Sequence, residues 1–280
     1  MSPRVVGIIP ARYGSTRLPG KALKLILGKP MIQRVLERCL TARILDSVWV
    51  ATDDERIAHA VAAVGGKAIM TSPHHPSGTD RLAEAVTKIA ADIVVNLQGD
   101  QPFLDAAMIE EAVQPLLDDP ALPMATLMHP VVRSEDFANP SVVKVVVDRA
   151  GNALYFSRSL IPYPRQIISP SPPSQPPSSP DSARERGVEG GEGQKYVPHR
   201  VFEHVGLYVY RRDFLLTLAG LSPTPLEQIE SLEQLRVLEH GYKVRVVESR
   251  AADHEFTGFS VDTAEDIERA EQMLRERGFT

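Results

Sequence analysis

The chain has 280 residues, of which 43% are hydrophobic and 24% charged, as is typical of a soluble globular protein. No apolar run approaches the roughly 18 residues that a membrane span requires. A strand-like run from Val5 leaves no room for a targeting peptide, so we expect a cytoplasmic protein without a membrane span. The single cysteine, Cys39, excludes an internal disulfide framework and a multi-cysteine metal cluster.

The net charge of −5 is unevenly distributed along the chain. Residues 1–43 contain nine basic side chains and one acidic side chain, so the remaining residues carry a net charge of −13. A basic segment on an acidic chain indicates either an anion-binding segment or a solvated basic helix face. Because the chain is acidic and lacks a basic domain, we expect no nucleic-acid partner.

Short β-rich runs alternate with helical stretches in the first hundred residues. Strands are predicted at 5–10, 48–51, 67–70 and 93–97, and helices at 30–42, 55–64 and 80–90. Cys39 lies on the apolar stripe of the first helix, which indicates a core residue. This alternation predicts an α/β fold with a parallel sheet and right-handed crossovers.

The pattern changes after about residue 120. Strand-like runs are found at 124–132, 142–148 and 153–157, and helical patterns at 211–219, 226–239 and 263–277. Residues 149–152 read as the turn of a hairpin. The sequence therefore predicts one domain over residues 1–280 with an inserted, more antiparallel subregion.

Residues 165–198 break the pattern. Residues 169–182 contain six prolines and six serines, and four glycines follow. Such a stretch cannot bury enough apolar surface to offset its ordering entropy, so we expect a disordered insertion. A proline-rich ligand for an interaction domain is the alternative.

The first strand continues into residues 10–21, PARYGSTRLPGK. Three cations, two hydroxyls and two glycines at the carboxyl end of a buried strand are suited to a polyphosphate. The segment is not a Walker loop, because five residues separate Gly14 from Gly20 and Ala22 replaces the magnesium-binding hydroxyl.

Two aspartates lie at the ends of other predicted elements. Asp100 follows the strand at 93–97, and Asp262 precedes the helix that begins at Thr263. If they meet beside the basic loop, they could hold Mg²⁺ against a triphosphate. Alternatively, Asp100 is a turn residue and Asp262 caps a helix.

Seven short segments, which occur in this order along the chain, carry the resemblance to a known family. They are 10–21, 77–81, 98–102, 154–158, 225–227, 232–236 and 261–263. Together they resemble the 3-deoxy-manno-octulosonate (Kdo) cytidylyltransferases, or CMP-Kdo synthetases, over nearly the whole chain except about 165–198. The resemblance implies a Rossmann-like nucleotidyltransferase sheet with an inserted antiparallel, dimer-forming subregion. It also implies CMP transfer from CTP to the anomeric hydroxyl of Kdo, giving CMP-Kdo and pyrophosphate for lipopolysaccharide or cell-wall polysaccharide synthesis.

The same resemblance assigns residues to roles. The catalytic set is Arg12, Lys21, Asp100 and Asp262, of which Asp100 and Asp262 would bind the Mg²⁺ cofactor. The nucleotide-binding set is Pro10, Ala11, Arg12, Ser15, Arg17, Lys21, Ser77, Gly78, Thr79, Arg81 and Gln98. The sugar-binding set is Gln101, Arg158, His204, Glu230 and Gln234, with a cation facing the sugar carboxylate. The basic residues Lys29, Arg34, Arg38 and Arg43 are left as a solvated helix face.

Three positions differ from the pattern of this family. Gln101 replaces a common acid, Gln228 a common histidine, and Ser260 a common glycine. These differences leave an amino-Kdo or a sialic acid open as the acceptor. A non-catalytic nucleotide-binding protein is the alternative of a different class.

Overall fold

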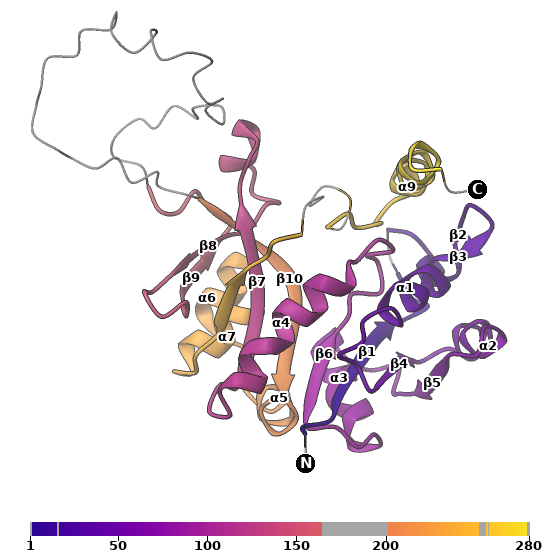
Figure 1. The fold of residues 1–280 in the computed structure, drawn as a ribbon, viewed down its shortest axis with the longest axis horizontal. Helices are drawn as coiled ribbons and strands as arrows, with labels where there is room; N and C mark the ends of the chain where they lie inside the picture. Colours follow the sequence, from indigo (N-terminus) through magenta and orange to yellow (C-terminus); the bar gives the residue numbers. More distant parts are fainter. Residues whose placement is uncertain (1, 16, 164–200, 252–255, 257, 279–280) are drawn as a thin grey trace, which may run out of the picture.

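The computed structural model describes residues 2–15, 17–163, 201–251, 256 and 258–278, so the predicted insertion at 165–198 lies outside the described residues. Within them, one nine-stranded sheet has the order β11-β7-β10-β6-β1-β4-β5, and the β8–β9 hairpin joins it through β10 (Figure 1). The strands are β1 (Val5–Ala11), β4 (Ser47–Thr52), β5 (Lys67–Met70), β6 (Ile93–Asn96), β7 (Met124–Pro130), β8 (Lys144–Val147), β9 (Ala153–Ser157), β10 (Phe202–Arg211) and β11 (Arg245–Glu248).

The four strands β6, β1, β4 and β5 are parallel, which confirms the prediction for the first hundred residues. Side chains of β1 alternate between two cores, because successive residues of a strand point to opposite faces of the sheet. Val5 and Ile9 pack on one face, and Val6 and Ile8 on the other. The first face is covered by α1 (Met31–Cys39), α2 (Glu55–Ala63), α4 (Ala106–Asp118) and α9 (Ala264–Glu276). The second is covered by α3 (Gly78–Thr87), α5 (Arg212–Ala219) and α7 (Gln234–Glu239).

The predicted antiparallel subregion is present. β8 and β9 form the expected hairpin, whose turn contains Gly151 with a φ of 79°. β10 is antiparallel to both β6 and β7, with a bulge between Val205 and Tyr208. This strand joins the hairpin to the parallel part of the sheet.

Several elements differ from the prediction. Helix α4 and strands β10 and β11 were not predicted. The single helix expected at 226–239 is two helices, α6 (Pro225–Glu230) and α7, because Ser231 adopts a left-handed φ of 52°. The basic loop is followed by short elements: η1 (Lys21–Leu23), β2 (Leu25–Ile26) and β3 (Lys29–Pro30). A second 3₁₀ turn, η2 (Ser134–Phe137), follows β7.

The prediction of a solvated basic face on the first helix is wrong for two residues. Arg34 donates to the carbonyl oxygens of Ile26 and Leu27, at 2.7 and 3.1 Å. Arg38 donates to the carbonyl of Leu104 at 3.1 Å. These guanidinium groups therefore hold neighbouring loops against α1.

Cys39 is buried, as predicted, and burial raises the pKa of its thiol to about 12. No helix in the part of the chain that the structure describes is long and apolar enough to cross a membrane.

Gly99 brings the segment after β6 against the end of β1. A Cβ atom at this position would lie 2.7 Å from the carbonyl oxygen of Pro10, which is closer than real contacts allow. A glycine is therefore required where the 98–102 segment approaches the basic loop.

We predict that Gly99→Ala lowers the free energy of unfolding by about 1–3 kcal/mol, because the backbone must shift to admit the methyl group. Urea denaturation measures the change. Gly14→Ala is the control, since a Cβ there meets no atom within 4 Å, and it should be nearly neutral. Equal stability of the two variants would contradict the close-approach argument.

Candidate active site

The basic loop after β1 is organised around Tyr13. The Tyr13 carbonyl oxygen accepts hydrogen bonds from the backbone amides of Ser15 and Gly20, at 3.0 and 3.2 Å. Gly20 has a φ of +68°, which favours glycine, and the chain then enters η1. Within the loop the Ser15 hydroxyl accepts from the amide of Leu18 at 3.3 Å. This turn places Lys21 at the carboxyl edge of the sheet.

Lys21 lies between the two predicted aspartates. Its ammonium donates to Asp100 Oδ2 at 2.8 Å and to Asp262 Oδ1 at 2.9 Å. Arg17 donates to the same Asp262 oxygen at 3.0 Å. Asp100 and Asp262, which are far apart in sequence, therefore meet beside the basic loop, which was the condition of the magnesium hypothesis.

Backbone contacts explain why the two aspartates meet. The amide of Val261 donates to the carbonyl of Asp100 at 2.9 Å, which joins the two segments directly. Asp266 caps α9 and accepts from the amides of Asp262 and Thr263, both at 2.9 Å. Because Asp266 and Thr263 serve as the helix cap, the carboxylate of Asp262 is left to face Lys21.

Two carboxylates that share one ammonium group also suit a divalent cation. Magnesium in proteins is commonly held by one or two carboxylates together with substrate phosphates. The Lys21 ammonium lies where a cation would meet both aspartates, so the donor set fits Mg²⁺.

The residues predicted to bind nucleotide lie around this cluster. Arg12 is exposed and, in the part of the chain that the structure describes, makes no hydrogen bond or ion pair. Pro10 and Ala11 end β1, and a Cβ on Gly78 would lie 3.7 Å from the Pro10 ring. The start of α3 therefore faces the start of the basic loop.

The other members of the nucleotide set contact protein groups. Ser77 caps α3 by accepting from the amide of Asp80 at 3.1 Å, and Thr79 donates to Glu233 at 2.6 Å. Gln98 Nε2 donates to the carbonyl of Gly206 at 3.0 Å. Arg81 is buried and points inward, away from solvent.

The predicted sugar-binding residues divide into two groups. Gln101 and His204 line a cavity of about 400 Å³. Gln234 and His204 line a second cavity of about 430 Å³, which shares several residues with the first. These three residues border two open, adjoining cavities, and the first lies beside the charged cluster because Gln101 directly follows Asp100.

Arg158 and Glu230 line neither cavity. Glu230 accepts from the Ser157 hydroxyl at 2.6 Å and from the Arg158 amide at 3.0 Å. Arg158 donates through Nε to the Glu230 carbonyl at 2.7 Å. The two side chains join β9 to the α6–α7 turn, and the structure does not bring them together with Gln101 and His204.

Two residues that line these cavities carry a buried amide atom with no hydrogen-bond partner among the described residues. These are Oε1 of Gln101, an acceptor, and Nε2 of Gln234, a donor. Oε1 of Gln234 is already occupied, because it accepts from the Tyr208 hydroxyl at 3.1 Å. A ligand could reach these two buried atoms only if the amide groups turned toward the cavities.

Three residues that border these cavities were missed by the sequence analysis. They are Glu203, which pairs with His129 at 2.9 Å, Tyr208 and Glu233. Glu233 was within reach of prediction, because it belongs to the 232–236 motif. Glu203 and Tyr208 lie on β10, which was not predicted.

His204 is neutral at physiological pH. Desolvation lowers the pKa of its imidazole from 6.5 to about 3. Its Nε2 lies 2.9 Å from the Thr126 hydroxyl, whose oxygen also lies 2.9 Å from the Leu207 carbonyl. Because a hydroxyl has one proton to donate to a carbonyl, its oxygen accepts from Nε2–H, and Nδ1 of His204 is left as an acceptor.

The lowered pKa of His204 predicts a specific pH dependence of stability. Below pH 6.5 the unfolded histidine binds a proton that the folded one excludes, so stability falls as the pH drops toward 3. The expected slope is about 1.4 kcal/mol per pH unit. Denaturation of the wild type and of His204→Gln at pH 7.5 and 5.5 measures it. The variant should lose less stability over this range, and parallel losses would contradict the buried neutral state.

A mixed α/β sheet with a cationic loop and two aspartates at its carboxyl edge is the arrangement of an α/β nucleotidyltransferase. The sequence model of the cytidylyltransferase family matches residues 6–275, so the chain belongs to the cytidylyltransferase family.

Similar proteins extend over almost the whole chain. A 3-deoxy-manno-octulosonate cytidylyltransferase of Syntrophotalea carbinolica is 49% identical over 271 residues, 97% of this chain and 98% of that protein. The protein of the same name from Geobacter metallireducens is 48% identical over 273 residues, with 97% and 98% covered. The solved structure of a CMP:2-keto-3-deoxy-manno-octonic acid synthetase complexed with CTP aligns with a TM-score of 0.81 at 45% identity, covering 98% of this chain and 99% of that one.

Proposed function

We propose that this chain transfers CMP from CTP to the anomeric hydroxyl of Kdo, giving CMP-Kdo and pyrophosphate. The contact of Lys21 with both Asp100 and Asp262, at 2.8 and 2.9 Å, is the observation that carries the proposal. Two relatives that are 49% and 48% identical to this chain are named for this activity.

The basic loop is suited to the triphosphate. Arg12 and Arg17 are exposed, and Arg17 retains 67% of its side-chain exposure although it pairs with Asp262. The Lys21 ammonium donates to both aspartates. With Mg²⁺ between the aspartates instead, the ammonium would be free to donate to phosphate oxygens, beside two guanidinium groups that can form forked contacts.

The nucleotide's base would lie toward α3. Ser77, Gly78 and Thr79 form the start of this helix, and Gln98 follows β6 opposite them. These residues adjoin Pro10 and Ala11, so one ligand can contact this segment and the basic loop at once.

The acceptor would occupy the two cavities beside Gln101 and Gln234. If these amide groups turned toward the ligand, Nε2 of Gln234 would donate to a carboxylate or hydroxyl, and Oε1 of Gln101 would accept from a hydroxyl. His204 would contribute the acceptor Nδ1 and no charge. A sugar acid rich in hydroxyls satisfies each of these groups.

Catalysis would consist of positioning and charge neutralisation. The anomeric oxygen attacks the α-phosphorus in line, the bond from that phosphorus to the bridging oxygen breaks, and pyrophosphate leaves while the hydroxyl proton passes to solvent. Arg12, Arg17 and Lys21 would compensate the charge that develops on the phosphates. Asp100 and Asp262 would hold Mg²⁺, which when bound neutralises phosphate charge and acidifies the attacking hydroxyl.

We place the enzyme in the cytoplasm, where CTP is available, as a source of activated sugar for lipopolysaccharide or cell-wall polysaccharide.

A homodimer would form through the antiparallel subregion. Leu154 of β9 and Ile229 of α6 support this, because these large apolar side chains are 63% and 78% exposed there.

The direct test is pyrophosphate release by the purified protein with CTP, Mg²⁺ and Kdo. We expect rapid release with Kdo, and little when UTP replaces CTP. An 8-amino-Kdo and a sialic acid are run in parallel. Turnover of one of these without turnover of Kdo would reject the acceptor. CTP binding by calorimetry without turnover of any sugar acid would favour a non-catalytic protein.

The aspartate pair provides a second prediction. Asp100→Asn and Asp262→Asn should each lower kcat/KM by on the order of 100-fold or more, because each removes a charged ligand for the cation. Steady-state kinetics measures the loss, and circular dichroism confirms folding. Asp105→Asn is the control, since Asp105 caps α4 and asparagine caps equally well. Wild-type activity in either test variant would contradict a shared cation.

A further inference from the structure

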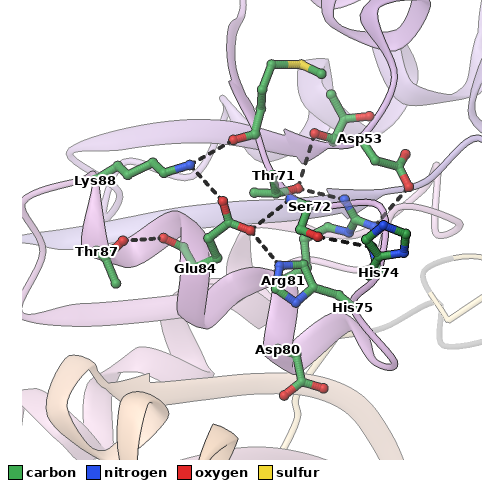
Figure 2. Close-up of polar contacts among 12 residues, drawn as sticks. Asp53, Thr71, Ser72, His74, His75, Asp80, Arg81, Glu84, Thr87 and Lys88 are labelled. Carbon is green, nitrogen blue, oxygen red and sulfur yellow. Dashed lines mark hydrogen bonds and ion pairs between the residues drawn. The ribbon is translucent and has the colours of Figure 1, made fainter.

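Asp53 lies directly after β4, between the basic loop and α3. Its Oδ1 accepts from the backbone amide of Tyr13 at 3.3 Å. Its Oδ2 accepts from Nη2 of Arg81 at 3.1 Å (Figure 2). The Asp53 side chain is 13% exposed and that of Arg81 only 4%. One partly buried carboxylate thus joins the loop that would hold the triphosphate to the helix that would meet the base.

The guanidinium of Arg81 is directed into the protein. Besides Asp53, it donates through Nη1 to the Thr71 hydroxyl at 2.6 Å. The Thr71 hydroxyl in turn donates to the carbonyl of Thr52 at 3.1 Å, at the end of β4. The amide of Arg81 lies 3.4 Å from the carbonyl of Ser77, in the first turn of α3. Arg81 therefore connects the start of α3 to the ends of β4 and β5.

Tyr13 links Asp53 to the rest of the basic loop. Its carbonyl organises the loop by accepting from two amides, as described above, while its own amide is held by Asp53. The Tyr13 ring lies under the guanidinium of Arg56, 3.5 Å from the ring centroid. The ring also limits the space at Gly20, where a Cβ would lie 3.3 Å away. Movement of Tyr13 would therefore displace the turn that places Lys21.

The segment between β5 and α3 is held by a separate contact. Glu84 accepts from the Ser72 amide at 2.8 Å, pairs with His75 at 2.6 Å and accepts from Lys88 at 2.7 Å (Figure 2). These bonds fix residues 72–77 to α3 itself. They do not reach the basic loop, which is connected to α3 through Asp53 and Arg81.

We infer that Asp53 and Arg81 are positioning residues, which set the distance between the basic loop and the start of α3 and thereby the affinity for a nucleoside triphosphate. This inference rests on the proposed function, in which one CTP molecule spans both segments. A loose connection would reduce the advantage of binding the phosphates and the base together, without changing the groups that would touch the reacting atoms.

The test uses Asp53→Asn, Arg81→Gln and the double variant in the pyrophosphate-release assay, at a temperature where each is folded. We expect the KM for CTP to rise at least 10-fold in each single variant, with kcat within about 3-fold and the KM for Kdo unchanged. Because both residues act through one contact, the double variant should resemble the worse single variant. It also leaves neither buried charge unpaired, so it addresses the case in which a single variant unfolds.

Arg211→Gln is the matched control. Arg211 ends β10 at the opposite edge of the sheet, where its guanidinium donates to the carbonyls of Leu116, Asp119 and Leu122. This variant should lower the melting temperature and leave the KM for CTP unchanged. If the Asp53 and Arg81 variants behave in the same way, or raise both KM values equally, the positioning role is overturned.

A wild-type protein that releases no pyrophosphate from CTP and Kdo would refute the proposed function instead. Calorimetric titration with CTP then still tests the pair, since the single variants should bind CTP at least 10-fold more weakly than the wild type. Equal binding would overturn the inference independently of turnover.

Discussion

The arrangement of the site depends on one electrostatic contact, the ammonium of Lys21 between two carboxylates. The carboxylates of Asp100 and Asp262 lie close together at the edge of the sheet. Two carboxylates in this position repel each other unless a cation lies between them. Lys21 supplies that cation at 2.8 and 2.9 Å. The contact joins the loop after β1, the segment after β6 and the start of α9, which are far apart in the chain.

The parallel sheet makes this contact possible. β1, β4 and β6 run in the same direction, so the segments that follow them emerge at one edge. The basic loop, Asp53 and Asp100 come from these three ends. Gly99 allows the segment after β6 to approach the backbone of Pro10. The site is therefore assembled from strand ends that the hydrophobic core holds in register.

Much of the fold was predictable because the signals are local. The strand at 67–70 was predicted with the observed bounds, and the other early strands within one residue at either end. Helix α4 was missed although Asp105 caps it, since Pro115 interrupts the helical pattern. The division of 226–239 at Ser231 depends on a left-handed residue that is not a glycine, and sequence gives little warning of this.

The residue types of the site could be predicted from the sequence better than the positions of their side chains. The residue types of the basic loop indicate an anion by themselves, and the meeting of Asp100 with Asp262 was a hypothesis until the fold was known. The inward direction of Arg81 and the bonds that occupy Arg158 and Glu230 depend on tertiary contacts. A charged side chain in a motif can bind other protein groups or a ligand. The sequence pattern alone does not distinguish a structural role from a ligand-binding role.

The position of β10 has a consequence for how the chain folds as it is synthesised. This strand lies between β6 and β7 and hydrogen-bonds to both, yet it spans residues 202–211. Until those residues have left the ribosome, β6 presents an open edge and β7 has no partner on that side. The pairing of β6 and β7 through β10, in the middle of the sheet, is therefore completed late. The first half of the nascent chain must remain available for this pairing until about three quarters of the chain has emerged.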